Sequence, residues 1–205
     1  MLAYDKSVLR ARLGKLPEKR RAIFAASCAE RLCPFYELYC SKTGRGGPER
    51  IRRALDVVWA GICEQQVAED SLRELAQNCE SLLPDEDNFW HDSSPYASNA
   101  AAAVIYALET PLSENPERAE WAAFQGFEAA WYYVDQRDDV DPNDRDALAK
   151  LHRSQEVQEE LARLEADLSE LERETTVGDS ELAERLRTRA QENPPCYLEQ
   201  LRRSS

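Results

Sequence analysis

Carboxylates are the side chains of this sequence best suited to chemistry, and they gather in two short segments, 84–92 and 135–146. Loops rich in carboxylate oxygens can hold hard cations such as Ca²⁺. Neither segment has the spacing of an EF-hand, and segment 84–92 lacks the closing Glu. We interpret segment 84–92 as a solvated acidic loop and segment 135–146 as a turn in which Asp and Asn residues cap the helix that follows.

An enzyme that uses carboxylates is the alternative hypothesis. It would be a carboxylate-based or metal-assisted hydrolytic enzyme of unknown substrate, centred on Asp85, Asp87, Asp92 and Glu128. The chain has only two His, and it lacks P-loop, Rossmann, kinase and nucleophile-elbow patterns. Its six Cys form no C-x-x-C pair, and three lie in apolar helical patterns, which predicts inert thiols. We expect no catalytic residue, no metal site and no cofactor.

Charge is divided unevenly along the chain. Residues 1–60 hold 13 Lys/Arg and 6 Asp/Glu, a net +7, whereas residues 61–205 hold 13 Lys/Arg and 33 Asp/Glu, a net −20. The acidic part would repel a polyanion, so we expect no binding of nucleic acid. We expect the basic N-terminal segment to face the protein's own acidic helices.

Pro and Gly residues divide the chain into segments with helical periodicity. One follows Pro17 with a break predicted at Pro34, and another begins at Pro48. Segments 99–108 and 121–134 are apolar on nearly all sides, which predicts burial. The aromatic side chains expected in the core are Trp59, Trp121, Phe124, Phe127 and Trp131.

No segment alternates with the period of a strand. We therefore predict an all-α protein, with about seven or eight helices in one compact domain over residues 1–192 and a C-terminal tail over 193–205. The start of the chain has no signal-like apolar stretch, and the longest apolar run, 100–108, is too short to span a bilayer. We expect a soluble, cytoplasmic protein without membrane contact.

A long, highly charged helix is predicted from Asp144 to about Glu174. Leucines repeat along it in a three-four rhythm, which indicates a seam that packs on the domain or on a second copy of the chain. A homodimer is therefore one of the two alternatives for this seam. The outward carboxylates of this helix are the candidate face for a protein partner: Glu159, Glu160, Glu165 and Glu170.

Several short motifs occur in a specific order. They are E-R-hydrophobic-x-P-x-Y at Glu30–Tyr36, T-G-x-G at Thr43–Gly46, L-D-x-x-W at Leu55–Trp59, Leu83–Phe89, the Ala-rich stretch Asn99–Leu108 and Gln155–Leu161. This order resembles the YjaG-like family of uncharacterised bacterial proteins (domain of unknown function 416). That pattern carries an Asp after T-G-x-G and another at the start of the Ala-rich helix, where this sequence has Gly47 and Asn99. The resemblance implies an all-helical fold and no established activity.

The sequence favours a non-catalytic, cytoplasmic interaction protein whose acidic surface binds a basic protein, as an inhibitor, antitoxin or immunity protein does. Complementary charge speeds and selects such an association. We prefer this interpretation to an enzyme because the polar residues occupy turns and helix surfaces instead of converging on one point.

Overall fold

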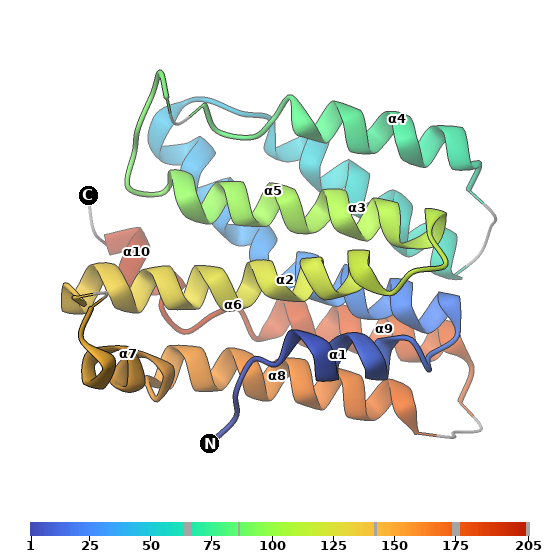
Figure 1. Ribbon diagram of the computed structural model, residues 1–205. Helices are drawn as coiled ribbons and strands as arrows, with labels where there is room; N and C mark the ends of the chain where they lie inside the picture. Colours follow the sequence, from blue (N-terminus) through green and yellow to red (C-terminus); the bar gives the residue numbers. More distant parts are fainter. Residues whose placement is uncertain (64–66, 86, 142, 174–176, 204–205) are drawn as a thin grey trace.

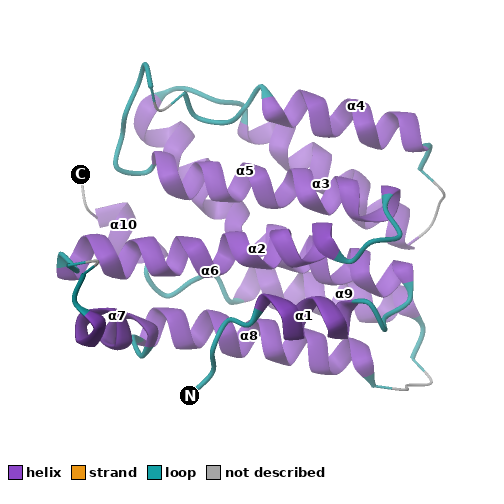
Figure 2. Ribbon diagram, in the orientation of Figure 1, coloured by secondary structure: helices purple, strands orange, loops and turns teal. Residues whose placement is uncertain are grey.

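The computed structural model describes residues 1–63, 67–85, 87–141, 143–173 and 177–203, and these residues form helices and loops without a strand (Figure 2). The all-α prediction is confirmed. The elements are α1 (Lys6–Leu13), α2 (Glu18–Thr43), α3 (Pro48–Cys63), α4 (Glu69–Glu80), α5 (Ser94–Glu109), the 3-10 helix η1 (Thr110–Leu112), α6 (Glu117–Asp138), α7 (Arg145–His152), α8 (Gln155–Glu172), α9 (Asp179–Glu192) and α10 (Leu198–Arg203).

The described residues contain ten α-helices, so the predicted seven or eight is too low. Two short helices at the ends of the chain, α1 and α10, gave too few residues for a periodic pattern. Helix α1 begins because Asp5 accepts hydrogen bonds from the backbone N–H groups of Ser7 and Val8. The long helix predicted from Asp144 is two helices, α7 and α8, because Ser154 at the N-cap of α8 has a non-helical ψ of 150°. Its predicted end, Glu174, lies outside the described residues.

The break predicted at Pro34 does not occur. Helix α2 runs through this residue for 26 residues. A proline inside a helix removes one backbone hydrogen bond and crowds the preceding turn. Sixteen residues of α2 are buried, and its contacts with α3, α5, α6 and α9 hold it as a helix despite that cost.

The helices form two packed layers (Figure 1). One layer runs α4, α5, α6 and α8, and the layer behind it holds α3, α2 and α9. Helix α5 can lie against both α2 and α6 because its inward positions are alanines, among them Ala97, Ala101 and Ala107. The core lies between the layers.

None of the helices in the described ranges combines the length and apolar character needed to cross a membrane.

The prediction of buried aromatic side chains is right for Trp59 and Phe127 and too strong for the other three. Trp121, Phe124 and Trp131 are half-buried. Helix α6 packs on its neighbours mainly through buried alanines, so these larger side chains lie at the edge of the interface.

Residues 193–203, which belong to the segment expected to be a tail, include α10. Tyr197 is buried there, and its ring lies 5.2 Å from that of Phe35 and 4.7 Å from that of Tyr133. This segment therefore packs on α2 and α6.

Candidate functional site

Two consecutive charged residues of α2, Glu30 and Arg31, are buried. Their side chains leave the helix in different directions because successive residues of a helix are rotated by about 100°. The carboxylate of Glu30 accepts a hydrogen bond from Trp59 Nε1 at 2.8 Å and from Gln191 Nε2 at 3.0 Å, and it pairs with Arg52. It therefore joins α2 to α3 and α9.

Arg31 points toward α8. Its Nη1 lies 2.6 Å from Asp167 Oδ2, and its Nη2 lies 3.4 Å from Glu160 Oε1. Burial by itself would lower the pKa of Arg31, but the carboxylates of Glu160 and Asp167 raise it above its ordinary value. Arg189 of α9 donates to the second oxygen of Asp167 at 2.7 Å. This cluster ties three helices together, and its charges are matched within it.

The motif residues of the sequence meet in these contacts. Asp56 of the L-D-x-x-W motif pairs with Arg187, whose Nε lies 3.8 Å from Glu30 Oε2. In T-G-x-G, Gly44 ends α2 with a φ of 67°, and Gly46 has a φ of 90°. Both conformations favour glycine. These motif residues therefore have structural roles in the fold.

The four carboxylates of α8 predicted as a partner-binding face are engaged within the molecule. Glu160 is buried beside Arg31, and Glu159 lies 3.5 Å from Arg163. Glu165 and Glu170 lie 2.6 Å from Arg12 and 2.8 Å from Arg189 respectively.

The prediction that basic N-terminal residues face the protein's own acidic helices is confirmed for part of that segment. The pairs from this segment include Arg12–Glu172, Arg20–Asp179, Arg31–Asp167 and Arg10–Glu120. Ion pairs across helix interfaces therefore offset part of the acidic charge of residues 61–205, and the chain keeps a net charge of −13.

The carboxylates of the enzyme hypothesis occupy two separate elements. Asp85, Asp87 and Asp92 lie exposed in the loop between α4 and α5, and Glu128 is exposed on α6. In the described part of the chain, no group of three or more His, Cys, Asp or Glu side chains is placed to hold a metal ion.

One surface combines exposed carboxylates with exposed apolar side chains, and we call it the α4 surface. It consists of α4 and the described residues of the loop that follows, up to Asp92. Its exposed carboxylates are Glu69, Asp70, Glu74, Glu80, Asp85, Asp87 and Asp92. The first two pair with Arg73, and within the described residues the other five have no ion pair.

Leu83 and Trp90 are the exposed apolar residues of the α4 surface, at 40% and 54%. Phe89 beside them is covered by Arg45, whose guanidinium lies 3.9 Å from the ring centre. The sequence predicted this loop to be solvated or, in the alternative hypothesis, to supply catalytic carboxylates. It did not predict an exposed Trp90, whose only signal is a tryptophan outside any helical periodicity.

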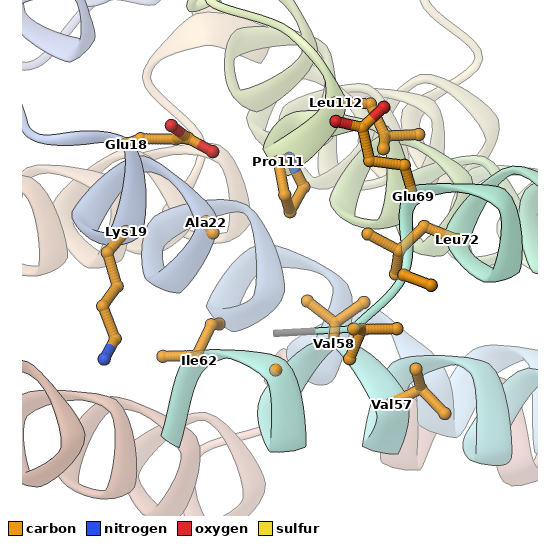
Figure 3. A pocket seen from close by; sticks show the side chains of 13 residues that line it. Glu18, Lys19, Ala22, Val57, Val58, Ile62, Glu69, Leu72, Pro111 and Leu112 are labelled. Atoms are coloured by element: carbon orange, nitrogen blue, oxygen red, sulfur yellow. The ribbon is translucent and has the colours of Figure 1, made fainter. Parts of the chain in front are cut away.

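A groove of about 690 Å³ adjoins the α4 surface (Figure 3). Its walls come from α2, α3, α4 and η1 and are mostly apolar, with Val58, Ile62, Leu72 and Leu112 among them. Glu18 and Glu69 lie on opposite sides of its rim, and Lys19 also lines the groove. Ligand pockets commonly have a volume of about 300–1,000 Å³, so the groove has room for a side chain of a partner.

These features define a two-layer helical protein held by buried ion pairs. Residues 9–194 match the family described as "Protein of unknown function (DUF416)", and the chain belongs to this family.

Two relatives show how far the similarity extends. The chain is 28% identical over 102 residues to the uncharacterised protein YjaG of Escherichia coli K12; the match covers 50% of this chain and 52% of that protein. The chain thus spans about half the length of this relative. The crystal structure of a DUF416 family protein from Shewanella baltica OS155 superposes with a TM-score of 0.78 at 21% identity, over 89% of this chain and 92% of that one. This second likeness is one of fold.

Proposed function

We propose that this protein is a non-catalytic, cytoplasmic interaction protein that binds a basic protein partner through the α4 surface. The observation that carries the proposal is the contrast between two acidic faces. The carboxylates of α8 are paired with arginines of the same chain, whereas five carboxylates of the α4 surface have no ion pair within the described residues.

Unpaired exposed carboxylates attract a basic partner over distances of about 10 Å at 0.1 M salt. Such steering raises the rate of association more than it lowers the rate of dissociation. An exposed tryptophan supplies the complementary part, because Trp is enriched among the residues that contribute most to binding energy. Trp90 is therefore the anchor that we assign to this surface.

The apolar groove extends the same surface past the start of α4. A partner segment with basic side chains around an apolar one matches a groove whose walls are mostly apolar and which two carboxylates, Glu18 and Glu69, line against one cation, Lys19. Inhibitors, antitoxins and immunity proteins bind partners in this way, and we place the protein in this group.

All six Cys are free thiols, which is usual in a reducing compartment and supports a cytoplasmic location.

The first experiment identifies the partner, by affinity purification from the native host followed by mass spectrometry. The second measures association of that partner by stopped flow with two variants of equal charge change. In the test variant Glu74, Glu80, Asp87 and Asp92 are replaced by Lys. In the control variant Glu114, Glu181, Glu184 and Glu192, which are exposed on other elements, are replaced by Lys.

We expect the test variant to associate at least about tenfold more slowly at low salt, with a smaller difference at high salt. The control variant should change the rate much less. Trp90→Ala should accelerate dissociation. Equal rates for the two charge variants would overturn the assignment of this surface.

The α8 face is the second candidate, because Glu159 and Glu165 are only half-buried. Replacing these two residues by Lys tests it in the same assay. Glu160 does not enter that test because its reversal would place an ammonium group beside buried Arg31.

A further inference from the structure

A second cavity, of about 420 Å³, lies between the N-terminal segment, α5 and α6. Four aromatic side chains line it: Tyr4, Tyr106, Trp121 and Phe124. Tyr106 and Trp121 meet edge to face with ring centres 5.4 Å apart, and Tyr4 lies 5.6 Å from Phe124. The cavity explains why Trp121 and Phe124 are only half-buried, since each turns part of its ring toward this opening.

The cavity also contains a buried carboxylate. Glu120 is 1% exposed, and each of its oxygens has one close donor. Oε1 accepts from the Tyr4 hydroxyl at 2.9 Å, and Oε2 accepts from Arg10 Nη2 at 2.8 Å. A carboxylate has about four acceptor positions, so Glu120 can accept further hydrogen bonds from a ligand in the cavity.

Lys6 lies near this carboxylate but does not form a hydrogen bond with it. Its Nζ is 3.9 Å from Glu120 Oε2, which is too long for a hydrogen bond, and its side chain is 57% exposed. An ammonium group therefore already approaches the cavity, but it is held loosely at the first residue of α1. A ligand with the same charge can displace it.

We propose that this cavity is a binding site for an organic ammonium ion. Aromatic rings attract cations through the negative potential of their faces. One of these rings already contacts a cation outside the cavity, since the guanidinium of Arg118 lies 4.5 Å from the ring centre of Trp121. Rings together with one buried carboxylate suit an alkylammonium group better than an anion or a neutral apolar molecule. The inference is independent of partner binding at the α4 surface.

The test is a titration followed by the NMR signal of the Trp121 indole N–H, assigned with Trp121→Phe. The probes are tetramethylammonium, n-butylammonium and neutral tert-butanol, which resembles tetramethylammonium in size. We expect saturable shifts with the two ammonium ions at millimolar concentrations and none of comparable size with tert-butanol. Equal responses to the charged and the neutral probes, or no response to any probe, would overturn the proposal.

Variants separate the roles of the lining residues. Glu120→Gln should weaken tetramethylammonium binding about tenfold, and Phe124→Leu about fivefold. Lys6→Ala should strengthen it, because the competing ammonium is gone. The matched control is Glu117→Gln, because Glu117 also pairs with Arg10 but does not line the cavity. If Glu120→Gln fails to fold, Phe124→Leu and Lys6→Ala decide the matter; unchanged affinity in both would refute the site.

The ammonium group can belong to a small amine or to a lysine of another protein. A peptide with one central lysine, acetylated and amidated at its ends, separates these sources when compared with n-butylammonium. Tighter binding of the peptide, abolished when its lysine is acetylated, assigns the site to a lysine side chain. Binding of the free amines alone assigns it to a small molecule. The fourfold Lys variant of the α4 surface should leave either result unchanged.

Discussion

Arg31 Nη1 and Asp167 Oδ2 lie 2.6 Å apart, and each side chain is only 3% exposed. The pair joins α2 to α8 across 136 residues of sequence. Removing one partner of a buried pair leaves the other charge in a medium of low polarity, whereas replacing both by apolar residues can be nearly neutral. This asymmetry makes the pair testable.

We expect Asp167→Ala to lower the free energy of unfolding by about 3–5 kcal/mol, because it leaves Arg31 undercompensated. The double variant Arg31→Met/Asp167→Leu should recover part of that loss, because Glu160 then keeps Arg163 as a partner and Arg189 keeps Glu170. Urea unfolding followed by circular dichroism measures both. Glu165→Ala is the control, since it breaks a partly exposed pair worth about 1 kcal/mol or less. Equal losses for Asp167→Ala and Glu165→Ala would contradict the buried network.

Trp59→Phe removes the indole N–H that donates to Glu30 Oε2 at 2.8 Å. Hydrogen bonds to charged groups contribute about 1.5–3 kcal/mol, and we expect a loss of stability in this range. The thermal midpoint measures it. Trp90→Phe makes the same chemical change at an exposed position and should alter stability by no more than about 0.5 kcal/mol. Similar midpoints for the two variants would show that the bond to Glu30 is unimportant.

Gly46→Ala should be more destabilising than Gly44→Ala. Both residues have positive φ, so alanine at either costs about 1–2 kcal/mol of backbone strain. A Cβ at Gly44 meets open space, whereas one at Gly46 would lie 2.7 Å from Cys40 Sγ and 2.9 Å from Tyr36 Oη. Chemical unfolding of the two variants isolates the steric part. A smaller loss for Gly46→Ala would mean that Tyr36 and Cys40 move aside freely.

Arg12 should stabilise the protein against acid. It lowers the pKa of both Glu165 and Glu172 from the ordinary value of 4.5, chiefly through its side-chain hydrogen bonds. A carboxylate with a lowered folded-state pKa adds stability above its ordinary pKa, and this part is lost as the pH falls through the folded-state value. Because the three side chains are partly exposed, we expect Arg12→Met to cost about 1 kcal/mol at neutral pH.

The difference between wild type and Arg12→Met should hold from pH 7 to about pH 5 and then shrink as Glu165 and Glu172 take up protons. Unfolding free energies across this pH range measure it. A difference that stays constant down to pH 2 would indicate lost packing of the arginine stem instead of lost charge.

The sequence showed the net charge of each segment, but it did not show which residues form ion pairs. The basic N-terminal segment predicted an acidic counterpart in the same chain, and Arg12 and Arg20 meet one on α8 and at the start of α9. The choice of Glu165 for Arg12, 153 residues away, depends on the path of the chain. A count of charges therefore predicted that the basic segment has acidic partners in the same chain. Only the structure identified the carboxylates of the α4 surface that have no ion pair among the described residues.

Local pattern was sufficient to predict the helical class, because helical hydrogen bonds and apolar periodicity both act over three or four residues. Local pattern gave the wrong prediction at Pro34. There the packing of α2 against four helices outweighs the free energy that the proline ring costs inside a helix. The contacts of Glu30 with Gln191, of Arg31 with Glu160, of Arg12 with Glu165 and of Tyr4 with Glu120 each join residues more than 100 positions apart. Such contacts exist only after the helices have packed, so the tertiary structure alone decided them.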